Sequence, residues 1–139
     1  MRFPSIALAA MLPLLIGNTS GSLTVNVSGL KNTKGQLIAC LWATKASFPT
    51  CSKNGSAVKL KLAISGSNMS VTFPNVVPGT YSVTVEHDED SNGKLKTNII
   101  GMPKEGVGVS NNPGGIPSWN KAAIRVSGNG VISVKVRYL

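Results

Sequence analysis

The stretch that decides the fold is MSVTFPNVVPGTYSVTV, residues Met69 to Val85. Apolar and polar residues alternate from Met69 to Phe73 and again from Tyr81 to Val85, and Pro78-Gly79 lies between the two runs. A period of two places one face of a strand in the core and the other in water, and Pro-Gly is a turn signal. The stretch therefore predicts two strands joined by a tight reversal, with Tyr81 packing inward after it.

The same period recurs along the rest of the chain, with Gly-containing turn signals between the runs. The further predicted strands are Leu23–Val27, Gln36–Trp42, Val58–Leu62, Ala122–Val126 and Ile132–Tyr138. No long segment carries a helical period, and the chain has 15 glycines, 8 prolines and only 14% charged residues. These features predict an all-β fold, an antiparallel β-sandwich of about seven strands, immunoglobulin-like or transthyretin-like. A small closed barrel is the alternative.

One passage, from His87 to Lys121, breaks the pattern. It is polar, rich in Gly and Pro, and almost without a period. Loops of this length inside compact domains are usually functional or disordered. We expect ordered irregular structure over one end of the sandwich. Its expected anchors are Ile99, Ile100, Val107 and Trp119.

The N-terminal segment has the features of a secretory signal. Arg2 precedes an apolar run from Ile6 to Ile16, and small polar residues follow. The run is too short to cross a bilayer of roughly 30 Å as a helix. We therefore predict a signal peptide over residues 1–21, a β-sandwich domain over residues 22–139, and a secreted or periplasmic mature protein without a transmembrane span.

Export would move the two cysteines of the chain out of the reducing cytoplasm. An oxidising compartment favours a disulfide between Cys40 and Cys51. Two unpaired thiols or a redox pair is the alternative, although the spacing is unlike C-x-x-C.

The chain is strongly basic, with a net charge of +9 from 14 basic and 5 acidic residues. Without Arg2 the chain has 13 basic and 5 acidic residues, so its net charge is +8. Such a surface favours anionic partners, but it also simply keeps a protein soluble. The basic residues are scattered singly, without a dense run or regular aromatics, so nucleic acid is not a predicted partner.

Four of the five acidic residues lie in EHDEDSNGKL, Glu86 to Leu95. The spacing D-x-D-x-N-G opens many calcium loops, in which alternate side chains and a backbone carbonyl supply oxygens. The expected ligands are Asp88, Asp90, Asn92, the carbonyl of Lys94 and, folding back from later in the chain, Glu105, Asn111 or Asn112.

The second half of the calcium pattern is missing. Ile99 stands where a twelve-residue loop has its bidentate Glu, and Lys96 occupies the ninth position. The alternative is an Asn-Gly turn with solvated carboxylates and local side-chain hydrogen bonds.

Little in the sequence indicates catalysis. His87 is the single histidine, no nucleophile motif is present, and one histidine with two oxidised cysteines is a poor zinc set. Trp42, Trp119 and Tyr138 could stack on sugar rings, or they could pack in the core.

Three further blocks resemble a known family. His87–Leu95, Gly101–Gly106 and Ser110–Asn112 are similar to the "H-D-x-N-x-N-G-x-L", "G-x-P-x-E-G" and "S-N-N" blocks of the exported bacterial family called domain of unknown function 2141. The likeness runs from about Leu23 to Tyr138. Phe73–Val85 also resembles the "F-x-N-L-x-P-G-x-Y" motif of transthyretin-like and carboxypeptidase-regulatory-like sandwiches.

The resemblance implies export and a single β-rich domain, but no established activity. Members often have Asp or Asn where this chain has Lys96, so a cation site that used this position would lose a ligand. We expect an exported, non-catalytic structural or binding module, with calcium as a candidate stabilising ion and an envelope glycan or protein as a candidate partner. A glycan- or anionic-polymer-binding module is the alternative, and a hydrolase is third.

Overall fold

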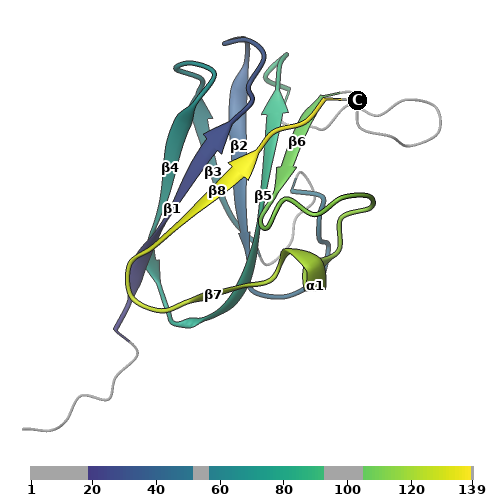
Figure 1. Cartoon of the computed structure of the whole chain (residues 1–139). Coiled ribbons are helices and arrows are strands. Elements are labelled where there is room, and N and C mark those ends of the chain that lie inside the picture. Colours follow the sequence, from purple (N-terminus) through teal and green to yellow (C-terminus); the bar gives the residue numbers. More distant parts are fainter. Residues whose placement is uncertain (1–18, 52–56, 93–104, 139) are drawn as a thin grey trace, which may run out of the picture.

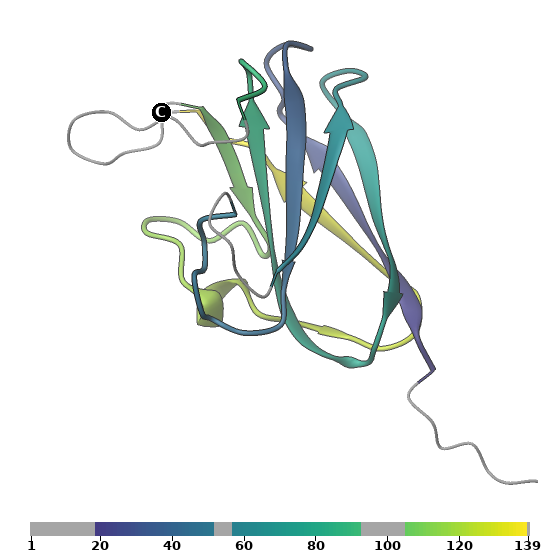
Figure 2. The ribbon, with the colours of Figure 1, turned by 180° about the vertical axis from the view of Figure 1, so that it is seen from behind.

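The chain forms a sandwich of two β-sheets (Figures 1 and 2). The structure is a computed structural model that describes residues 19–51, 57–92 and 105–138. The three-stranded sheet has the order β4-β1-β8, and the second sheet has the order β3-β2-β5-β6, with β7 pairing with β5. The elements are β1 Gly21–Ser28, β2 Gln36–Trp42, β3 Val58–Ala63, β4 Met69–Val76, β5 Gly79–Asp88, β6 Gly106–Val109, α1 Trp119–Ala122, β7 Ile124–Val126 and β8 Gly130–Lys135.

The predicted all-β sandwich is confirmed, and its core follows the period of two. On β1 the odd-numbered residues Leu23, Val25 and Val27 are buried. They face side chains from the other sheet, such as Val83 and Val85. Full burial of such a side chain contributes about 1.5–3 kcal/mol, so alternation along each strand sets which face turns inward.

The predicted reversal at Pro78-Gly79 is present, but it does not form a hairpin. It leads from β4 in one sheet to β5 in the other, so the two strands are not paired with each other. Tyr81 packs against the core and stays partly exposed, while its hydroxyl donates to the Val77 carbonyl at 2.6 Å. The hydroxyl thus fixes the corner where the chain changes sheets.

Strand β8 corrects the prediction that every pair is antiparallel. It runs parallel to β1, with Val25 opposite Ile132. The chain leaves β7, which pairs with the start of β5, and turns at Gly128 and Asn129 straight into β8. Strands β1 and β8 therefore enter the sheet from the same end, as Figure 1 shows.

Strand β6 was not predicted, because half of its four residues are glycines. A Cβ on Gly106 or Gly108 would overlap Tyr138 or Val134. The missing side chains let β6 approach the C-terminal segment, where Val107 and Arg137 exchange two backbone hydrogen bonds of 2.9 Å. These bonds join the two sheets along one edge.

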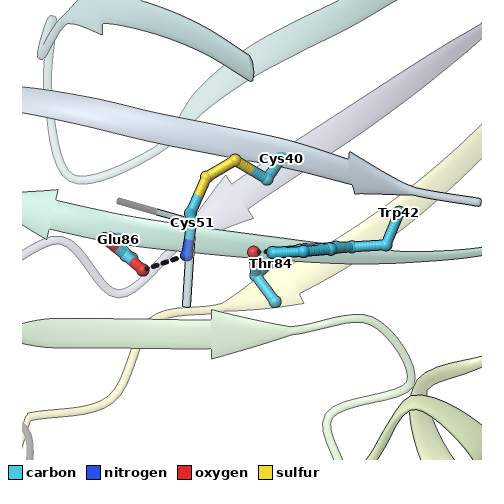
Figure 3. The surroundings of a disulfide bond; sticks show 5 residues. All are labelled: Cys40, Trp42, Cys51, Thr84 and Glu86. Atoms are coloured by element: carbon cyan, nitrogen blue, oxygen red, sulfur yellow. Dashed lines mark hydrogen bonds between the residues drawn. A yellow bond between two sulfur atoms is a disulfide. The ribbon is translucent and has the colours of Figure 1, made fainter. Parts of the chain in front are cut away.

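A second apolar cluster covers the outer face of the larger sheet. Ile38, Cys40 and Trp42 point outward from β2 and pack with Cys51 of the loop that crosses them. The predicted disulfide between Cys40 and Cys51 is present (Figure 3). It attaches the loop to the sheet. The predicted anchors Val107 and Trp119 lie in β6 and α1, whereas Ile99 and Ile100 lie outside the described residues.

Removing the disulfide should lower the stability of the sandwich. A bridge spanning 11 positions limits the unfolded chain and is worth about 2–3 kcal/mol. The double variant Cys40→Ser/Cys51→Ser should lose that much free energy of unfolding in a urea titration. Equal urea midpoints for the double variant and the wild type under non-reducing conditions would contradict this role. A wild-type midpoint that does not change when reductant is added would contradict it as well.

Candidate functional site

All five acidic residues of the chain lie in the half of the larger sheet where β5 ends. Glu86 and Asp88 end β5, Glu89 and Asp90 follow in the turn, and Glu105 directly precedes β6. Because β5 and β6 pair with His87 opposite Gly106, Glu105 returns to the level of Asp88. The sheet register therefore brings together carboxylates that are about 15 positions apart in the sequence.

Three of these carboxylates converge. Oxygens of Asp88, Asp90 and Glu105 lie within 4.8 Å of one another. Asp88 is 2% exposed and Glu105 is 4% exposed, whereas Asp90 lies at the surface. The carboxylates of Asp88 and Glu105 are therefore not the solvated groups that a simple surface turn would have.

Hydrogen bonds orient the cluster. Asp88 accepts from Gln36 Nε2 at 2.8 Å and from the Asn92 backbone N–H at 3.2 Å. Glu105 accepts from the Glu89 backbone N–H at 2.7 Å. The alternative hypothesis of an Asn-Gly turn predicted local side-chain hydrogen bonds, and these are present. They hold buried carboxylates next to each other, however, and not solvated ones. Such a group of oxygens is a suitable ligand set for a hard cation.

The other expected ligands are less well placed. Asn92 is exposed, and its Nδ2 donates to Asp90 Oδ2 at 3.4 Å. Lys94 lies outside the described residues. Asn111 and Asn112 bond to other elements of the sandwich and do not return to the cluster.

Glu89 has a separate role, although it lies between Asp88 and Asp90. Its Oε1 pairs with Lys31 Nζ at 3.1 Å. The hydrogen bond from Lys31 lowers the pKa of Glu89. Lys31 Nζ in turn lies 4.6 Å from the centre of the Tyr138 ring. The pair fastens the turn after β5 to the C-terminal segment.

His87 is enclosed by hydrogen bonds on both ring nitrogens. Nε2 lies 2.7 Å from the Lys34 carbonyl, which can only accept, so Nε2 carries a proton. In the neutral ring Nδ1 then accepts from the Tyr138 hydroxyl at 2.6 Å. Burial raises the pKa of Tyr138, so this hydroxyl keeps its proton. The single histidine is fully buried and connects β5 to the loop between β1 and β2 and to the C-terminal segment.

Glu86 carries a buried carboxyl group, which the sequence analysis did not predict. Its side chain lies on the outer face of β5, as do those of Thr84 and Asp88. It is one position beyond Val85, where the predicted strand ended. Oε1 accepts from the Cys51 backbone N–H at 3.4 Å (Figure 3), and Oε2 has no partner among the described residues. Burial, opposed by that hydrogen bond, raises the pKa of Glu86 to about 7. Extending the period of two past Val85 would have found it.

The Ser110-Asn111-Asn112 block fastens three elements together. Ser110 Oγ accepts from the Val83 backbone N–H and donates to the Ala122 carbonyl. The side-chain amide of Asn111 donates to the carbonyls of Lys121 and Ala123. Both asparagines have positive φ, which Asn tolerates better than most residues.

Asn112 also covers an exposed sheet edge. Its Oδ1 accepts from the Lys135 backbone N–H at 2.8 Å, and its Nδ2 donates to the Ser133 carbonyl at 3.3 Å. The side chain thus pairs with β8 as a neighbouring strand would. Because an unpaired edge invites pairing with another chain, this amide protects β8.

Ser110→Ala should therefore destabilise the protein without touching the acidic cluster. The change leaves a buried N–H and a buried C=O without partners, which costs on the order of 2–4 kcal/mol. Ser133→Ala, which removes an exposed hydroxyl, is the matched control. Equal urea midpoints for the two variants would count against the fastening role.

The pH dependence of stability should reveal Glu86. Its pKa is about 7 in the folded protein against 4.5 for an ordinary glutamate side chain, so the fold favours the protonated acid and loses stability as pH rises from 4.5 to 7. The difference in unfolding free energy between Glu86→Gln and wild type should grow by about 3 kcal/mol over that window.

Glu89→Gln is the control variant, because the pH dependence of stability that comes from Glu89 has the opposite sign to that from Glu86. The lowered pKa of Glu89 stabilises the fold above the unfolded pKa, and this gain is lost on acidification. Parallel pH profiles for wild type and Glu86→Gln would refute the buried-acid assignment.

Comparison with known proteins assigns the chain to a family. No curated protein and no solved structure matches it. Across the described ranges, no helix is long and apolar enough to cross a membrane. The family described as "Uncharacterized protein conserved in bacteria (DUF2141)" matches residues 25–134, which is more than half of the chain. This protein therefore belongs to the DUF2141 family, as the resemblance of its sequence blocks indicated.

Proposed function

We propose that this protein is an exported, non-catalytic module of the bacterial cell envelope or extracellular space, and that a calcium ion stabilises its acidic end. The single observation that carries the metal is the convergence of Asp88, Asp90 and Glu105 within 4.8 Å. Export is supported by the signal-like features of residues 1–21 and by the disulfide between Cys40 and Cys51.

The size of the carboxylate group favours calcium over magnesium. Calcium binds oxygens at about 2.3–2.6 Å, so two ligands on opposite sides of it are up to about 5 Å apart. Magnesium binds at about 2.0–2.1 Å, which limits such pairs to about 4 Å. Oxygens that lie within 4.8 Å of one another are inside the span that a calcium ion bridges, and water can complete its shell.

Electrostatics give the ion a stabilising role. Carboxylates held this close repel each other when ionised, and two of the three are buried. A divalent cation would offset that repulsion and connect the end of β5 to the start of β6. Ligation by Asn92 and the Lys94 carbonyl remains an expectation from the D-x-D-x-N-G spacing.

A non-catalytic role agrees with the state of the reactive side chains. The single histidine uses both ring nitrogens in internal hydrogen bonds. Both cysteines are joined to each other, and Ser110 is fully occupied as a structural hydroxyl. These contacts support a module that binds or spaces other components.

Calcium should raise the melting temperature of the protein. Excess ligand stabilises the folded state by about 2.7 kcal/mol at 100 times Kd, which corresponds to a shift of several degrees. The shift should disappear in Asp90→Asn and in Glu105→Gln. Scanning fluorimetry in chelator, in calcium and in magnesium measures it.

The matched control is Glu89→Gln, which removes the same charge from a residue outside the cluster. This variant should keep the calcium response. The metal assignment fails if about 10 mM calcium leaves the melting temperature unchanged, since such a site would be weaker than even typical extracellular modules. It also fails if Glu89→Gln loses the response to the same degree.

A further inference from the structure

A small cleft lies at the opposite end of the larger sheet from the acidic cluster. It has a volume of about 260 Å³. It opens between the loop after β2 and the segment that enters α1, and it is lined by Lys45, Phe48, Pro117, Ser118, Trp119 and Asn120. This volume is below the roughly 300–1,000 Å³ of sites for drug-sized ligands, so the cleft suits one or two small rings.

The apolar part of the cleft is held in place from below. Phe48 packs edge-on against Trp42, with ring centres 5.6 Å apart. Trp42 is fully buried and fixed by its Nε1 donating to Thr84 Oγ1 at 2.9 Å. Ser82 Oγ donates to the Trp119 carbonyl and anchors α1 to β5. The aromatic wall is therefore largely formed before any ligand arrives, which lowers the entropic cost of binding.

Only one of the three aromatic residues considered for sugar stacking lines this cleft. Trp42 is enclosed in the outer cluster, and Tyr138 packs against His87. Trp119 is half-buried and borders the cleft. Its indole N–H is buried without an acceptor among the described residues, and the ring packs against the outer cluster, so packing and not a hydrogen bond holds it.

Polar groups complete the lining. Lys45 and Asn120 are exposed. Ser118 Oγ accepts from the Lys121 backbone N–H, which leaves its own proton to donate. A ring with an apolar face and a polar rim matches this combination of aromatic walls and hydrogen-bonding groups. A pyranose ring has that shape and chemistry.

The charge distribution selects an anionic ligand. Ser82 pairs with Trp42 near the cleft, whereas Asp88 pairs with Gln36 at the far end of the same two strands. Six residues of strand separate these pairs by about 20 Å. Asp88, Glu89, Asp90 and Glu105 lie at the far end, whereas Glu86 lies between the two ends and is buried beside the Cys51 N–H. In Figure 1 the arrow of β5 ends at the top of the sheet, and α1 lies near its base. The lining of the cleft thus includes Lys45 and no carboxylate, and Lys121 follows the lining residues within α1.

We infer that this cleft binds a sugar ring of an acidic glycan, with the ring stacked on Trp119 and Phe48 and its carboxylate paired with Lys45. The inference rests on the proposed role as a binding module, but it does not depend on calcium. Part of the affinity comes from the Lys45 charge, so binding should weaken with salt.

Calorimetric titration with trigalacturonate tests the inference. Wild type should bind it, and should bind the neutral counterpart galactotriose about tenfold or more weakly. Lys45→Ala and Trp119→Ala should each weaken binding by about tenfold or more, the size expected for loss of a partly desolvated contact of about 1.4 kcal/mol. Lys135→Ala removes the same charge from an exposed position on the smaller sheet and should bind as wild type does.

Several outcomes would overturn the inference. They are absence of heat at millimolar trigalacturonate, equal binding of galactotriose, equal binding of a hexaglutamate peptide, or equal weakening by Lys45→Ala and Lys135→Ala. Because Trp119→Ala could perturb α1, the exposed Lys45→Ala variant decides the matter alone. Repeating the titration with Asp90→Asn in chelator separates this site from the metal: glycan binding should persist even where the calcium proposal fails.

Discussion

The structure depends on the desolvation of one polar strand face. Strand β5 is buried from Ser82 to Asp88, and its outward side chains are Ser82, Thr84, Glu86 and Asp88. Buried polar groups need hydrogen-bond partners, and each of these four side chains has one outside β5, in β2, in the disulfide-linked loop or in α1. The partners are the Trp119 carbonyl, Trp42 Nε1, the Cys51 N–H and Gln36 Nε2. The disulfide-linked loop and α1 are positioned by this requirement, because they cover and satisfy the same face.

The arrangement also separates two environments along a single strand. At the start of β5 the covering elements leave a cleft with aromatic walls and lysine at its border. At the end of β5 the cover is incomplete, and the carboxylates of Asp88 and Glu105 meet that of Asp90 at the surface. The carboxylate cluster and the lysine-bordered cleft thus lie at opposite ends of β5. A cation and an anionic ligand would therefore bind without competing.

Some of the sequence blocks that resembled functional motifs belong to the candidate metal site, and others make structural hydrogen bonds. The Asp88-x-Asp90 spacing supplies two carboxylates of the candidate metal centre. The Ser110-Asn111-Asn112 block is instead a fastening, because its side chains bond to β5, to the end of α1 and to β8. His87 likewise joins β5 to Lys34 and Tyr138. Polar residues clustered in a sequence therefore serve packing as readily as binding, and only their partners distinguish the two.

Local sequence alone was sufficient for the class of fold, seven of the strands, the disulfide and the D-x-D part of the acidic cluster. Alternation, turn residues and cysteine count are properties of short segments, and they predict structure wherever burial follows a regular period. Tertiary structure decided the rest: the passage from β4 into the other sheet, the parallel pairing of β1 with β8, the glycine strand β6, and the approach of Glu105 to Asp88. Each of these depends on which strands become neighbours, and that is set by packing between segments far apart in the chain, for which no local period carries a signal.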